Sequence, residues 1–170
     1  MLAGVLLSCS DFNQREQLRA LENMTNTTDS LLDVIKNGVP DSLNTMRQTM
    51  LNTEIALKNK VTMDTVDMRY SVDMDTYNLA INRIGKIYHH RLELDATLKK
   101  EKKQLANLKN DIEKGWGKRS EYNQYIKLEE KNIKALTTKT QVLQKETLKV
   151  CEVYRLLHPK MKTLLRTVIE

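Results

Sequence analysis

The residue types that most often do chemistry in proteins are few in this 170-residue sequence, and they are widely spaced. His89 and His90 are adjacent, so on a helix their side chains point to different faces, and His158 is remote from both. The two cysteines, Cys9 and Cys151, form no CxxC motif. There is also no phosphate-binding glycine loop and no paired base and nucleophile. We therefore expect no catalytic site, no metal site and no cofactor.

Methionines are the most numerous soft ligands in the sequence, and thioethers can bind Cu(I). Met46 and Met50 are four residues apart and would share one face of a helix, whereas Met63, Met68 and Met74 do not join them. Methionine is also a common filler of helical cores. We expect these side chains to pack in a core and not to hold a metal.

Trp116 is the only tryptophan and stands between two glycines in the segment KGWGKRS. Lys114, Lys118 and Arg119 flank it. An aromatic ring among cations could contact a membrane interface or a protein partner. The simpler alternative is that the ring packs over the end of the helical core.

Near the N-terminus, Leu6-Leu7-Ser8-Cys9 resembles the lipobox of bacterial lipoproteins. In that class the cysteine thiol receives diacylglycerol, and a signal peptidase cleaves before it. The resemblance implies that residues 1–8 are the remnant of a signal sequence and that Cys9 is the lipid attachment site. Leu7 is bulkier than the usual small residue, and no Lys or Arg precedes Cys9. The alternative is that these residues are the apolar start of a helix.

The composition predicts an all-α protein. Charged residues make up 29% of the chain and aromatics 5%, with only five Gly and two Pro. That is too little turn chemistry for a β-sandwich or an α/β fold. No run of 18 or more apolar residues occurs, so no segment is expected to span a membrane as a helix.

Two helices are expected before the clearest pattern begins. The first covers residues 9–40 and ends at Asn37-Gly38-Val39-Pro40, where Gly and Pro favour termination. The second covers residues 41–76. It either continues into the next helix or breaks near residues 60–64, where Val, Thr and Asp are frequent.

Residues 77–158 carry two sets of heptads separated by a turn at 115–119. Both sets have mostly apolar a and d positions, which predicts an antiparallel coiled-coil hairpin. Ser120 is the expected N-cap of the second arm, and Pro159 is expected to end or kink it before a short helix over 159–170. The a and d positions, here called the heptad seam, are Tyr77, Ala80, Ile84, Ile87, Arg91, Leu94, Leu98, Glu101, Leu105, Leu108 and Ile112, then Ile126, Glu129, Ile133, Leu136, Thr140, Leu143, Thr147, Val150, Tyr154 and Leu157.

With the turn centred on Gly117, each a position of one arm lies opposite a d position of the other. In this register every polar seam residue faces an apolar one, as Glu101 faces Ile133. Polar seam residues can fix register or mark where another helix docks. The whole fold is therefore expected to be an elongated antiparallel coiled-coil hairpin with additional N-terminal helices that cover part of its seam.

Charge is distributed unevenly. Residues 1–82 carry a net charge of −4, residues 83–119 carry +6, and residues 120–170 carry +4. Basic arms could attract an anionic partner, or their lysines could simply solvate exposed helix faces. No aromatics are interleaved with the cations, so nucleic acid is not an expected partner.

Three functional hypotheses follow. The first is a non-enzymatic lipoprotein of the bacterial cell envelope, periplasm-facing or surface-facing, which acts as a coiled-coil spacer and binds an unidentified protein. The second is a cytoplasmic coiled-coil adaptor or chaperone-like subunit. The third, with the weakest support, is a basic coiled coil that binds nucleic acid. A homo-oligomer is compatible with each of them.

Overall fold

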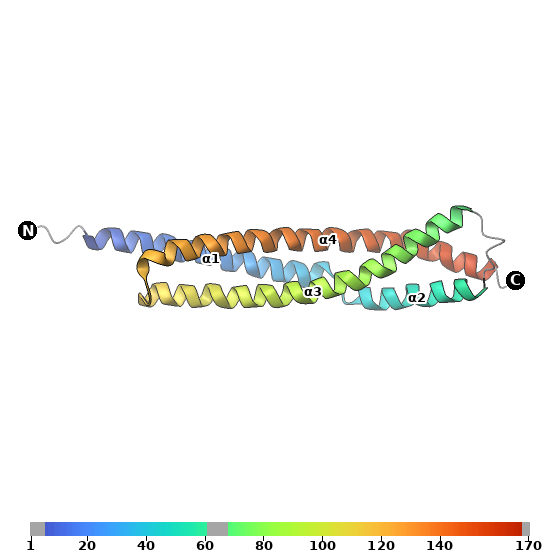
Figure 1. Ribbon diagram of the computed structural model, residues 1–170, viewed down its shortest axis with the longest axis horizontal. Helices are drawn as coiled ribbons and strands as arrows, with labels where there is room; N and C mark the ends of the chain where they lie inside the picture. The colour runs from blue at the N-terminus through green and yellow to red at the C-terminus, as the bar shows by residue number, and fades with distance from the viewer. Residues whose placement is uncertain (1–5, 61–67, 168–170) are drawn as a thin grey trace, which may run out of the picture. The chain divides into compact units, whose positions relative to one another are not determined.

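The computed structural model describes residues 6–60 and 68–167, with side chains for residues 13–60 and 70–167 (Figure 1). The helices are α1 (Leu6–Gly38), α2 (Ser42–Lys60), α3 (Met68–Lys114) and α4 (Tyr122–Thr167), with a short 3₁₀ helix, η2 (Arg119–Glu121), before α4. Within these described ranges there is no strand. The predicted all-α class is confirmed.

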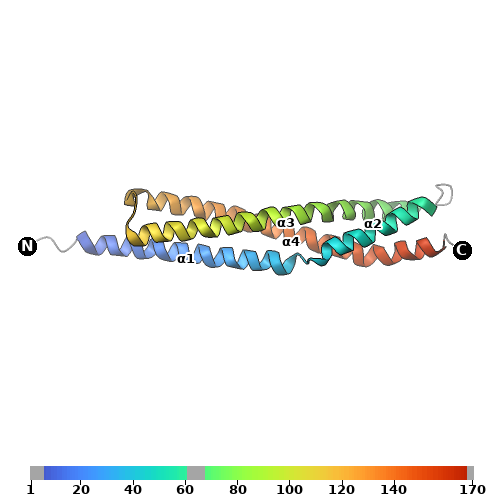
Figure 2. The same cartoon turned by 90° about the horizontal axis from the view of Figure 1, so that it is seen from below.

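The helices α3 and α4 form the predicted antiparallel hairpin (Figure 2). They contain 47 and 46 residues, and a tight turn followed by η2 joins them. Of the seam positions, only Arg91, Leu108 and Tyr154 are half-buried, and the others are buried. A hydrophobic repeat close to 3.5 residues therefore specified both arms and the faces by which they pack.

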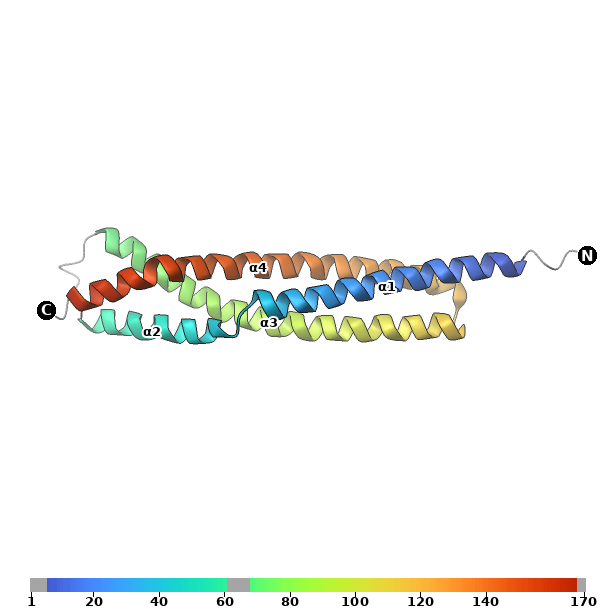
Figure 3. The same ribbon diagram turned by 180° about the vertical axis from the view of Figure 1, so that it is seen from behind.

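The chain divides into two compact units. Unit 1 comprises residues 1–35 and 93–141, and unit 2 comprises residues 36–92 and 142–170. Each unit combines one N-terminal helix with one stretch of α3 and one of α4 (Figure 3). The additional N-terminal helices thus supply the third helix of each unit.

In unit 1, α1 packs on the turn-proximal parts of α3 and α4. The Gln17 side-chain amide donates a hydrogen bond of 2.7 Å to the Asn123 side chain. An ion pair of 2.6 Å joins Asp29 to Lys102. The core between these helices is apolar and comprises Leu21, Met24, Leu105, Ile112, Tyr122, Ile126 and Ile133.

In unit 2, α2 packs on the other parts of α3 and α4. The Arg47 Nε atom donates a hydrogen bond of 3.3 Å to the carbonyl of Ile81, and its guanidinium lies against Gly85, which has no side chain to obstruct it. At the start of α2, Asp41 pairs with Arg91 at 2.6 Å. The polar seam residue Arg91 therefore holds the segment that leads into α2. The largest fully buried side chains here are Leu43, Met50, Leu57, Tyr77, Ile81, Ile84, Ile87 and Met161.

Two details of the hairpin differ from expectation. Pro159 was expected to end or kink the second arm before a short helix, and the structure shows one helix, α4, that continues through Pro159 to Thr167. Leu157 and Met161 are buried on either side of the proline, so core packing continues across it. Ser120 does not cap α4, because it lies inside η2. The helix α3 begins at Met68, and the predicted break near residues 60–64 falls mostly on residues 61–67, which lie outside the described residues.

Candidate functional site

The turn between α3 and α4 was the main candidate site in the sequence, and two glycines shape it. Gly115 and Gly117 have φ angles of 65° and 83°, a region that side chains disfavour. The backbone N–H of Trp116 donates a hydrogen bond of 2.8 Å to the carbonyl of Asp111. The turn therefore holds the Trp116 backbone firmly against the end of α3.

The Trp116 ring points away from the core. The residue is 58% exposed, and the Lys114 ammonium lies 4.4 Å from the ring centroid, a cation–π contact. The alternative in which the ring packs over the end of the core is wrong. Tyr122 takes that place: it is buried, and its hydroxyl donates hydrogen bonds to the carbonyls of Trp116 and Asp111.

The other two predicted tip residues are engaged locally. Lys118 pairs with Glu121 at 3.1 Å. Hydrogen bonds from Tyr125 and then Lys118 lower the pKa of the Glu121 carboxyl. The guanidinium of Arg119 covers Gly115 so closely that a Cβ there would collide with it. The structure thus gathers Lys114, Trp116, Lys118 and Arg119 into one exposed cationic turn.

The two cysteines have different surroundings. Cys9 lies in the first turns of α1, and its side chain is outside the part of the chain that the structure describes. Cys151 is half-buried on α4, and burial raises the pKa of its thiol. A raised pKa keeps the thiol protonated and less nucleophilic.

The core of unit 1 contains two buried carboxyl groups, those of Glu101 on α3 and Glu129 on α4. Asn132 donates a hydrogen bond of 2.8 Å to Glu129 Oε2. Burial, followed by the hydrogen bond and charge of Glu129, raises the pKa of Glu101 to about 7.

The core of unit 2 contains a polar aromatic cluster. The Tyr77 hydroxyl lies 2.6 Å from His158 Nδ1, and the Tyr154 ring stacks on His158 with centroids 4.7 Å apart. Burial, and then the Lys162 charge, lowers the pKa of His158. Burial raises the pKa of Tyr77. These shifts favour the neutral forms of both side chains, which share one buried hydrogen bond.

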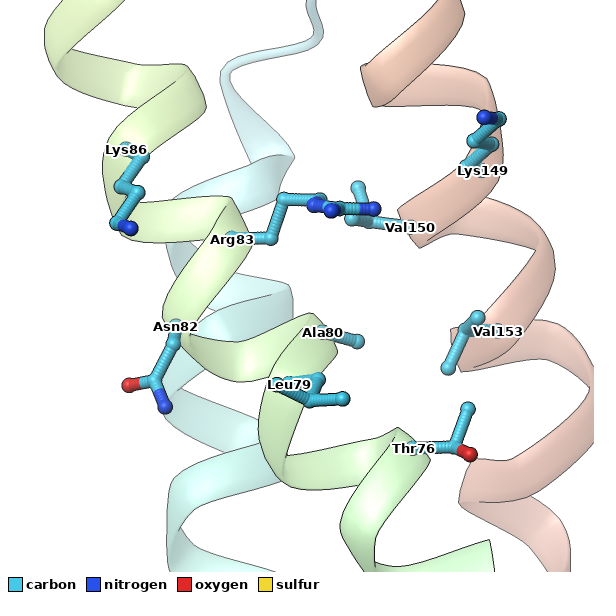
Figure 4. A pocket seen from close by; sticks show the side chains of 9 residues that line it. All are labelled: Thr76, Leu79, Ala80, Asn82, Arg83, Lys86, Lys149, Val150 and Val153. Carbon is cyan, nitrogen blue, oxygen red and sulfur yellow. The ribbon is translucent and has the colours of Figure 1, made fainter.

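A groove that the sequence analysis missed runs between α3 and α4 in unit 2 (Figure 4). It has a volume of about 280 Å³. Its floor is apolar, and cationic side chains stand along it (Figure 4). The apolar lining residues are Leu79, Ala80, Val150 and Val153, and the cations are Arg83, Lys86 and Lys149.

A sequence signal for this groove exists beside the heptad seam. On α3, Val72, Leu79 and Lys86 recur every seven residues, and on α4 so do Val142, Lys149 and Leu156. The four apolar members are each more than half exposed. Because two of these six positions are lysines, the stripe is easily taken for an ordinary solvated face.

The described residues show no group of three or more His, Cys, Asp or Glu side chains that could hold a metal ion. Among the same residues, no helix is both long and apolar enough to cross a bilayer. No protein-family model, curated protein or solved structure matches the sequence.

Proposed function

We propose that the protein is a non-enzymatic, membrane-anchored helical spacer that binds another protein. One observation carries the proposal: α3 and α4 are continuous helices of 47 and 46 residues joined by a tight turn. At about 1.5 Å per residue, each helix is about 70 Å long. Long, stiff helices that pack around a narrow core suit a structural or docking role.

The anchor in this proposal is a lipid on Cys9, and its support is the lipobox-like Leu6-Leu7-Ser8-Cys9. The protein would then belong to a bacterial cell envelope. Several acyl chains would hold it firmly, since each buried CH₂ contributes about 0.8 kcal/mol. The exposed Trp116 and its cationic neighbours form one surface that a partner or a headgroup layer could contact.

The first test is the intact mass of the mature protein, expressed from its gene with the native upstream region. We expect a chain that begins at Cys9 and carries acyl mass. A Cys9→Ala variant should lose the added mass and leave the membrane fraction. An unmodified chain that keeps Met1 would overturn the anchor, and the favoured function would then be the cytoplasmic adaptor or chaperone-like subunit.

Nucleic-acid binding is the remaining alternative, because residues 83–170 are strongly basic. It predicts an affinity for duplex or single strands that falls steeply with salt. We expect no such binding at physiological ionic strength. Titration of a labelled oligonucleotide at two salt concentrations distinguishes this function from the first.

A further inference from the structure

The groove of unit 2 is an open flank of a three-helix unit. Ile81 and Gly85 of α3 contact Arg47 of α2, whereas Leu79 and Arg83 line the groove. In Figure 4, the side chains of Arg83 and Val150 extend between α3 and α4, and the ribbon of α2 passes behind them. The α2 helix therefore leaves this flank of the α3–α4 pair uncovered.

The side chains on this flank have the spacing of a helix-docking surface. On α3 they follow a repeat of four and three residues, and on α4 they follow the same repeat once Glu146, between Val142 and Lys149, is included. Such a repeat on two neighbouring helices forms a groove in which a further helix lies along both. The residues are Val72, Thr76, Leu79, Arg83 and Lys86 on α3, and Val142, Lys149, Val153 and Leu156 on α4.

Charge identifies the kind of helix that fits. Arg83, Lys86 and Lys149 line the groove, and none of them forms an ion pair with an acidic side chain in the described part of the chain. Three other cations of unit 2 are paired: Lys58 with Glu54, Arg91 with Asp41, and Lys160 with Asp73. A docked helix with Asp or Glu at its flanks would supply the missing charges.

Two other occupants fit less well. Ligand pockets typically have volumes of roughly 300–1,000 Å³ and enclose most of the ligand, whereas this open groove of about 280 Å³ is too small to enclose an acyl chain. Two copies related by a twofold axis would place the three cations against each other. The acidic Asp29, Asp41 and Asp73 are already paired within the chain, so they are poor partners for a second copy.

We propose that this groove is the docking surface for an acidic amphipathic helix of another protein. Leucine-like side chains of that helix would lie on Leu79 and Val153, above the buried Ala80 and Val150, and its carboxylates would face Arg83, Lys86 and Lys149. The inference rests on the proposed role in protein binding and not on the lipid anchor. If the chain carries acyl mass but does not bind the helix, only the docking proposal is overturned. If the chain binds the helix but carries no acyl mass, only the lipid anchor is overturned.

The test uses the full chain and two labelled three-heptad peptides with Leu at a and d, one with Glu and the other with Lys at e and g. Fluorescence anisotropy should show the Glu peptide binding at least about tenfold more tightly, a difference of about 1.4 kcal/mol. Reversing two charges with Arg83→Glu and Lys149→Glu should invert the preference. The matched pair Lys103→Glu and Lys139→Glu in unit 1 should leave it unchanged.

A second variant tests whether the apolar side chains of the groove contribute to binding. Leu79 is 69% exposed, so Leu79→Asn should keep the helicity measured by circular dichroism and yet weaken binding of the Glu peptide at least about fivefold. Equal binding of both peptides, or unchanged affinity in the charge-reversed variant, would overturn the proposal. So would phosphatidylglycerol vesicles that bind in place of the peptide, or a dimer of the free chain that the charge reversal dissociates in sedimentation.

Discussion

Glu101 of α3 and Glu129 of α4 are both buried in unit 1, and Glu129 helps to raise the pKa of Glu101. Asn132 satisfies one oxygen of Glu129, whereas Glu101 Oε1 is buried without a partner among the described residues. Two ionised carboxylates in contact in a dry core would repel each other and remain under-solvated. The pair is therefore compatible with the core when one of its members holds a proton.

The first prediction is that stability falls as the pH rises toward neutrality. The folded pKa of Glu101 is about 7, above its ordinary value of 4.5, so the folded state binds more protons between these values. The stabilisation is complete below pH 4.5 and is lost as the pH rises through 7. At pH 8, Glu101→Gln should raise the free energy of unfolding by about 1–3 kcal/mol. Chemical denaturation across the pH range measures this.

The control for that prediction is Glu130→Gln, which alters an exposed glutamate next to Glu129 on α4. It should leave both the stability and its pH dependence unchanged. The difference between the native chain and Glu101→Gln isolates the pair from other titrating groups. If the free energy of unfolding changes with pH in the same way in the native chain and in Glu101→Gln, the prediction is contradicted. Both carboxyls of the pair would then be ionised in the folded state.

The second prediction concerns the Tyr77–His158 hydrogen bond of 2.6 Å. Tyr77→Phe removes one partner of this bond and leaves the buried His158 Nδ1 unsatisfied, which should cost about 1–2 kcal/mol. Tyr88→Phe is the matched control, because Tyr88 is 40% exposed. Thermal unfolding of both variants gives the comparison, and equal melting temperatures would contradict a stabilising role for this bond.

Much of the fold could be read from the sequence because the heptad repeat encodes it directly. Apolar residues at most a and d positions fix which face of a long helix is buried, and the glycines beside Trp116 fix the turn. The heptad rule says less about polar seam residues. It assigns each of them to a layer, but it does not predict that Glu129 helps to raise the pKa of the buried Glu101.

The surfaces were harder to predict than the core. Either Trp116 or Tyr122 could cover the end of the core. Tyr122 does so because its hydroxyl reaches the carbonyls of Asp111 and Trp116 in the turn. The groove depends on which flank α2 leaves open, and no single helix encodes that. Arg83 and Lys149 come from different helices, so their proximity appears only in the folded unit.

The third prediction separates the exposed and buried aromatics of the turn. Trp116→Ala should change the free energy of unfolding by less than about 0.5 kcal/mol, because the ring is 58% exposed. Tyr122→Phe should cost about 1 kcal/mol, because it removes the hydroxyl that bonds two backbone carbonyls of the turn. Urea denaturation distinguishes the two variants, and a larger loss for Trp116→Ala would contradict the exposed placement of its ring.

The last prediction concerns Pro159, which lies inside α4. Proline has no N–H, so the carbonyl of Arg155 lacks the hydrogen bond that a helix normally gives it. The helix continues because Leu157 and Met161 are buried on either side, and their packing offsets the lost bond. Pro159→Ala should restore the bond and raise the free energy of unfolding by about 1–3 kcal/mol. Gln144→Ala, an exposed change in the same helix, should have an effect within about 0.5 kcal/mol. A Pro159→Ala variant no more stable than the native chain would show that the proline ring contributes packing equal to the missing hydrogen bond.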